Sequence, residues 1–158
     1  MIPKQAYKQL VLSMLALIIA MSISRFAYTP ILPFMQQDTS MNNQNAGLLA
    51  TFNYLGYLIG AIIPMFITIK SKVFDLKLYV MINVISVIFM GLSDHFLIWS
   101  VLRIIGGITS GTIFVLASNV ALEALRMANK QSISGILYSA VGIGIFWLCC
   151  KVKNIANH

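Results

Sequence analysis

The stretch QLVLSMLALIIAMSISRFAYTPILPFM, from Gln9 to Met35, decides the fold class of this chain. It is apolar almost throughout, and a helix over it would be about 40 Å long, enough to cross a bilayer with some tilt. Arg25 falls near its midpoint. An arginine at that depth costs at least about 2.5 to 3.5 kcal/mol on insertion, so it normally faces a bundle interior or a watery cavity. Arg25 therefore marks a candidate binding or translocation pathway.

The rest of the chain has the same membrane character. Of its 158 residues, 59% are hydrophobic and only 9% are charged, proportions that a soluble globular domain does not have. We therefore expect an all-α integral membrane protein, with a partial bundle over residues 1–150 and a polar tail over 151–158. The apolar stretches predict five transmembrane helices, over residues 9–35, 46–69, 78–92, 96–122 and 135–150.

Lysine and arginine are unevenly distributed among the predicted loops, and this asymmetry predicts the orientation. Basic residues precede the first stretch, separate the second from the third, and separate the fourth from the fifth. Residues 36–45 and 93–96 contain no lysine or arginine. The amino terminus is therefore predicted to be cytoplasmic, in a bacterial-type plasma membrane. We attribute the net charge of +7 mostly to this bias and to anionic lipid, not to nucleic-acid binding.

Polar and helix-breaking residues surround Arg25 in the first stretch. Ser22 and Tyr28 lie about one helical turn from Arg25, so we expect all three to face the same interior. Pro30 and Pro33 each remove a backbone donor and are candidates for a kink or hinge. The first stretch thus combines a charge, a polar face and a possible moving part.

Two further polar residues are expected within the membrane. Asn53 either bonds to a neighbouring helix, which we favour, or touches a solute. Arg103 is a second cavity candidate, and its alternative is snorkelling along its stem to the headgroups. All four acids of the chain fall in or beside predicted loops, so no carboxylate is expected at the depth of Arg25. Its counter-ion would then be an anionic solute, a group outside this chain, or carbonyl and tyrosine oxygens.

Small residues recur at the spacing that lets two helices approach closely. We expect packing faces at Gly56 and Gly60 in the second stretch and at Gly107 and Gly111 in the fourth. No nucleophile with a base, nucleotide loop or metal-ligand spacing accompanies them, so we expect neither an enzyme nor a cofactor or metal site. Cys149 and Cys150 are adjacent, which suits neither a metal nor an ordinary disulfide.

Four segments resemble the opening half-domain of the major facilitator superfamily (MFS), with the closest similarity to its YbfB/YjiJ-type branch. They are SRFAYTPILPFM from Ser24, AGLLATFNYLGYLIGA from Ala46, LRIIGGITSGTIFVLAS from Leu102 and GILYSAVGIGI from Gly135. The resemblance implies the first five helices of a six-helix half, one of two halves around a central cavity. Arg103 with Gly107 resembles the fourth-helix signature, which is associated with substrate or proton handling. Arg25 and Arg103 would then face the same central space.

The resemblance implies secondary active transport by alternating access, with a small polar or anionic organic solute and the lipid bilayer as partners. From Trp147 onward the sequence no longer resembles the family. We therefore expect a truncated or frame-shifted product that is inactive alone and lacks a carboxy-terminal half. The alternative is a small, non-transporting membrane interaction or assembly subunit, whose glycine faces dock on partner helices.

Overall fold

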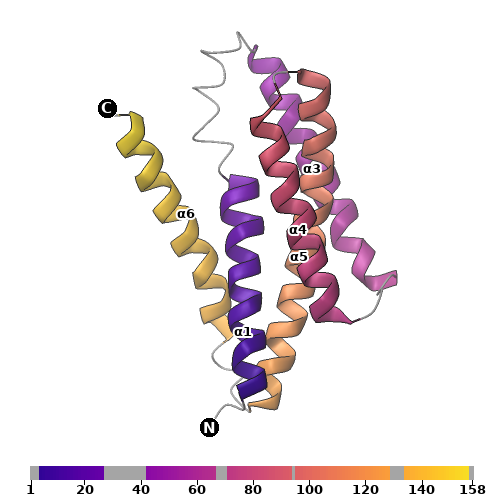
Figure 1. The fold of residues 1–158 in the computed structure, drawn as a ribbon, viewed down its shortest axis with the longest axis vertical. Coiled ribbons are helices and arrows are strands. Elements are labelled where there is room, and N and C mark those ends of the chain that lie inside the picture. Colours follow the sequence, from indigo (N-terminus) through magenta and orange to yellow (C-terminus); the bar gives the residue numbers. More distant parts are fainter. Residues whose placement is uncertain (1–3, 27–41, 67–70, 94, 129–133, 157–158) are drawn as a thin grey trace.

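The computed structural model describes residues 4–26, 42–66, 71–93, 95–128 and 134–156, and every element within these ranges is a helix (Figure 1). The all-α prediction is confirmed. The first helix has two parts, because α1 continues directly into η1, a segment of π-helix. The elements are α1 (Lys4–Leu17), η1 (Ile18–Phe26), α3 (Asn43–Phe66), α4 (Lys72–Gly91), α5 (Phe96–Met127) and α6 (Ser134–Ala156).

The helices form a bundle with α5 at its centre. Helix α5 contacts α1, η1, α3, α4 and α6, whereas α6 lies along α1 and η1 on one side of the bundle (Figure 1). Within the part of the chain that the structure describes, three helices, α3, α4 and α5, are long and apolar enough to cross a membrane. Shorter apolar stretches cover Ala6–Ser22 and Val141–Lys151. The protein is therefore a multi-pass membrane protein.

Several helices extend further than the apolar stretches that predict them. Helix α4 begins at Lys72, where the Ser71 side chain accepts a hydrogen bond from the backbone N–H of Phe74 at 3.3 Å. Asp75 in the first turn also favours this end, because a carboxylate complements the positive end of the helix dipole. Helix α6 likewise continues to Ala156, through residues expected as a polar tail. Hydropathy detects the part of a helix in hydrocarbon, whereas the backbone stays helical beyond it.

The backbones of α3 and α5 touch where their glycines face each other. A Cβ atom added at Gly56 would lie 2.5 Å from the carbonyl oxygen of Ile104. Added Cβ atoms at Gly60, Gly107 and Gly111 would likewise collide with carbonyl oxygens of the opposite helix. Lipid gives apolar surfaces no reason to associate, so close backbone contact of this kind is what holds such helices together.

Hydrogen bonds fasten α4 to α5. The amide nitrogen of Asn83, a fully buried residue, donates to the Thr109 hydroxyl at 2.8 Å and lies 3.3 Å from the Gly106 carbonyl oxygen. The Ser86 hydroxyl donates to the Leu102 carbonyl at 3.0 Å. At the connection between the two helices, the indole N–H of Trp99 lies 2.6 Å from the Ser93 carbonyl. These contacts fix α5 against α4 along its first half.

Candidate functional site

Arg25 lies at the carboxyl end of η1 and faces two tyrosines of α3. The carbon at the centre of its guanidinium is 3.9 Å from the ring centroid of Tyr57 and 5.1 Å from that of Tyr54. Both distances are within the range of cation–π attraction. Arg25 is half-buried and Tyr54 is 57% exposed. The cation is thus held by aromatic faces while part of it stays accessible.

The π-helical geometry of η1 changes which residues share a face with Arg25. Ser22 is fully buried, and its hydroxyl donates to the Val141 carbonyl of α6 at 3.2 Å. It also packs against Gly144, where an added Cβ atom would collide with it. The structure therefore places Ser22 in a helix contact with α6, while Arg25 faces α3. Hydrogen bonds from i to i+5 make a wider turn than an α-helix, so the expected one-turn neighbours point in different directions.

Arg103 is buried in α5, with 6% of its surface exposed. It lines a cavity of about 10 Å³ together with Asn53 of α3, Ser86 of α4 and Ser24 of η1. A volume of this size holds about one water molecule, and the lining offers it several polar partners. Four helical segments thus bring polar side chains to one point.

Aromatic rings continue from Arg25 across three helices. The Tyr57 ring of α3 lies 6.4 Å from the Phe114 ring of α5, measured between centroids. The Phe114 ring lies 6.3 Å from the Tyr138 ring of α6. Interplanar angles of 50° and 44° show tilted, not parallel, rings. We call Tyr57, Phe114 and Tyr138 the aromatic row.

Comparison with known families identifies the family of this chain. The family described as uncharacterised MFS-type transporter YbfB matches residues 17–155 of the chain. The chain belongs to this family. No curated protein and no solved structure matches the chain. The resemblance inferred from the sequence is confirmed, and the chain belongs to the general class of membrane transporters. The expectation that the resemblance ends at Trp147 was wrong, because the match continues to residue 155.

The structure brings together some of the predicted site residues of this MFS-type transporter and not others. Asn53 and Arg103 line one small cavity with Ser24, and Arg25 is not among the residues that line it. Ser22 instead contacts α6. Tyr28, Pro30 and Pro33 lie outside the described residues.

Sequence reasoning missed several polar and aromatic residues of the transporter. Tyr54 and Tyr57 were counted only as part of an apolar stretch, although their spacing places them on one helix face beside Asn53. Asn83 was also missed. An amide within an apolar stretch, the signal that singled out Asn53, would have identified it.

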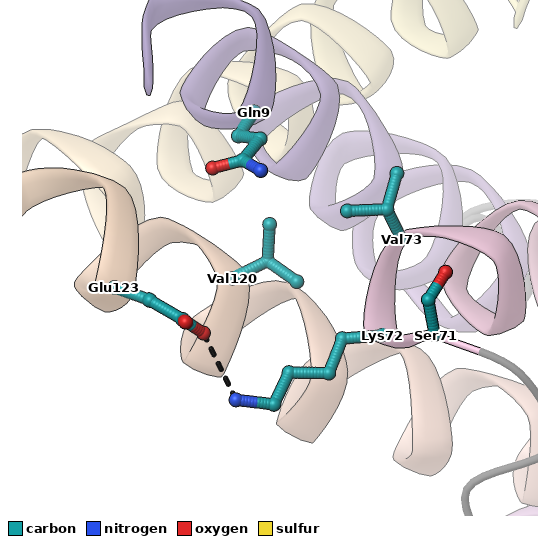
Figure 2. Close-up of a pocket in the computed structure, with 6 residues that line it drawn as sticks. All are labelled: Gln9, Ser71, Lys72, Val73, Val120 and Glu123. Carbon is teal, nitrogen blue, oxygen red and sulfur yellow. Dashed lines mark hydrogen bonds and ion pairs between the residues drawn. The ribbon is translucent and has the colours of Figure 1, made fainter. Parts of the chain in front are cut away.

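A larger cavity of about 180 Å³ lies at the opposite end of α5 from the arginines (Figure 2). Its lining includes Lys72 of α4 and Glu123 of α5, whose charged atoms are 2.9 Å apart. Both side chains are about half exposed, so this ion pair contributes little to stability. Among the described residues of the MFS-type protein, no three His, Cys, Asp or Glu side chains gather as a metal site would require.

Proposed function

We propose that this MFS-type protein supplies one wall of the cavity of a carrier that moves a small polar or anionic organic solute by alternating access, with Arg25 and Arg103 supplying positive charge to the solute path. The family supports membrane transport in general, and the two arginines supply the chemistry for the finer assignment. Arg25 would contact the solute directly. Arg103, which is buried beside Asn53 and a water-sized cavity, would contribute positive electrostatic potential to the solute path without contacting the solute.

The observation that carries this proposal is the half-buried Arg25, whose guanidinium carbon lies over the rings of Tyr57 and Tyr54. The N–H groups of a guanidinium can donate in pairs to a carboxylate. The guanidinium carbon of Arg25 is 3.9 Å from the Tyr57 ring centroid. This geometry therefore favours recognition of a planar anion over a simple structural role for the charge.

The orientation belongs to the proposal as well. We propose that the amino terminus lies in the cytoplasm and that the protein lies in the plasma membrane. The Lys72–Glu123 ion pair joins the start of α4 to the end of α5, so Lys72 and Arg126 lie at the same end of the bundle. One basic end of the bundle is what the cytoplasmic side of a membrane protein normally shows.

The alternative of a non-transporting assembly subunit is weakened by how the glycines are used. Such a subunit needs its small-residue faces free to dock on partner helices. Here Gly56 and Gly60 of α3 and Gly107 and Gly111 of α5 contact the opposite helix within one chain. The same surfaces are therefore already occupied.

A transport assay tests the proposal, using a carrier in which this bundle is joined to a second half of six helices. Uptake of radiolabelled benzoate, lactate and succinate would be measured in proteoliposomes containing the wild type, Arg25→Ala, Arg103→Ala or the control Lys8→Ala, which changes an exposed lysine at the far end. We expect uptake of at least one acid, lost in both arginine variants and kept in the control. The 158-residue chain alone is expected to give no uptake. Normal uptake by Arg25→Ala would refute the proposed role.

A further inference from the structure

The aromatic row begins beside the half-buried Arg25 of η1 and runs over three helices. Tyr57 and Phe114 are half-buried, and Tyr138 is 44% exposed. Tyr54, the second ring beside Arg25, is 57% exposed. Helices α3, α5 and α6 thus present aromatic rings, and η1 presents the Arg25 cation beside the first of them.

The exposed surface of α4 is mainly aliphatic. Six of its eight exposed large hydrophobic side chains are aliphatic or sulfur-containing, as lipid contact favours, including Met81, Ile82, Ile85 and Ile88, and the other two are Phe74 and Phe89. No described residue of α4 joins the aromatic row. The ring contacts and the Arg25 cation therefore lie on η1, α3, α5 and α6 and not on α4.

From this placement we propose that the solute of the MFS-type transporter is an arylalkanoate, an aromatic ring joined to a carboxylate by a short chain; the inference rests on the proposed function. The carboxylate accepts hydrogen bonds from the Arg25 guanidinium, which lies over the Tyr57 ring. The ring of the solute packs on the aromatic row. The positive charge of Arg25 favours an anionic solute, and the aromatic row favours one that contains an aromatic ring.

The spacing of the rings defines how the solute ring is bound. A ring sandwiched between two others needs partners about 7 Å apart and nearly parallel, since carbon atoms touch at about 3.5 Å. The pairs in the row are 6.4 Å and 6.3 Å apart and tilted, so no ring fits between them. The solute ring must instead pack on the accessible side of the row, in the offset or edge-to-face geometry that aromatic pairs prefer. Tyr138, the most exposed member, is the expected contact.

Three matched probes separate the contributions of charge and ring. The probes are 3-phenylpropionate, 3-cyclohexylpropionate, which keeps the charge without the ring, and 3-phenylpropanamide, which keeps the ring without the charge. Binding to the full chain would be measured by saturation-transfer NMR titration in phosphatidylcholine nanodiscs, with empty nanodiscs as the blank. Because the cyclohexyl acid enters lipid more readily, a preference for the phenyl acid cannot come from partitioning.

We expect 3-phenylpropionate to bind about two- to twelvefold more tightly than the cyclohexyl acid, the range of one aromatic contact. The variants Tyr138→Leu and Phe114→Leu should each reduce that preference, and Arg25→Gln should weaken both acids but not the amide. Phe89→Leu, on exposed α4, and Lys8→Gln should change nothing. Helical content by circular dichroism identifies any variant that does not fold, and the exposed Tyr138 decides the outcome if Phe114→Leu fails.

The two failures are distinguishable. Equal affinity for the phenyl and cyclohexyl acids, with both dependent on Arg25, would overturn the arylalkanoate assignment and leave the anion transporter standing. Binding of neither acid to the folded wild-type chain, or binding unchanged by Arg25→Gln, would overturn both. A preference for the phenyl acid that Tyr138→Leu leaves intact would also overturn the role of the aromatic row.

Discussion

Replacing Gly60 with alanine should loosen the crossing of α3 and α5. An added Cβ atom would collide with the Ile108 carbonyl oxygen and lie 2.8 Å from the Ile108 Cα atom. Both are backbone atoms of a helix, so no side chain can move aside. Ordinary contact begins near 3.4 Å, and the helices must separate by about 1 Å or more to restore it. The Thr112 hydroxyl, now 2.8 Å from the Gly60 carbonyl, would lose this partner.

The size of the effect follows from what the separation removes. A hydrogen bond between membrane helices contributes about 0.6 kcal/mol on average. Each close approach of a glycine Cα–H to a carbonyl adds about 0.5 to 1 kcal/mol, and at least two neighbouring contacts of this crossing would weaken together. The higher helix propensity of alanine than of glycine offsets up to about 1 kcal/mol of this loss in unfolding free energy. The net loss for Gly60→Ala is therefore about 1 to 2 kcal/mol.

Gly47→Ala is the matched control, because it lies in the same helix with nothing within 4 Å of an added Cβ atom. It should be neutral or stabilising by up to about 1 kcal/mol. Unfolding would be followed by circular dichroism as sodium dodecyl sulfate is titrated into mixed micelles. We expect Gly60→Ala to unfold at a lower detergent fraction, with the two variants about 1 to 3 kcal/mol apart. Equal midpoints for the two variants would refute the crossing geometry.

Three further predictions test other parts of the structure. Asn83→Ala should lower the unfolding free energy by about 1 to 2 kcal/mol, because α4 loses its bond to Thr109, while Val84→Ala on the exposed face should have less effect in the same titration. Lys72→Gln should cost less than about 1 kcal/mol and nothing in 1 M salt, and a larger, salt-independent cost would contradict an exposed ion pair. Cys149 and Cys150 are exposed near the end of α6 and should react with a membrane-impermeant maleimide on intact cells. Reaction only after permeabilisation would reverse the proposed orientation.

The helices could be predicted from the sequence because each contains a long apolar stretch, and hydropathy alone distinguishes these from the connections. The ends could not. The start of α4 depends on the Ser71 cap and on Asp75, whose effects are local to one turn and leave no trace in average hydropathy. The same holds for α6, where Lys151 lies within the helix although its charge suggests a tail. A charged residue near the headgroups costs little, so the helix has no reason to stop there.

The candidate site could be predicted in part. A charge or an amide in an apolar stretch is conspicuous in any sequence, and this signal identified Arg25, Asn53 and Arg103. The partners of Arg25 were hidden, because tyrosine is common in membrane helices and only the packing of η1 on α3 selects Tyr57. The direction of Ser22 was hidden for another reason. It depends on the π-helical turn, which follows from the fit of η1 against α5 and α6 and not from local propensity.

Packing and recognition are coupled in this bundle, because the α3 residues that hold Arg25 alternate with those that touch α5. Tyr57 lies one residue beyond Gly56, and its own carbonyl oxygen is the atom that Gly111 approaches. A change that moves α3 away from α5 by about 1 Å would therefore move the Tyr57 ring relative to Arg25 and Phe114. Cation–π and ring–ring attraction both fall quickly with distance. The glycine crossing thus sets the geometry of the proposed solute wall as well as the stability of the bundle.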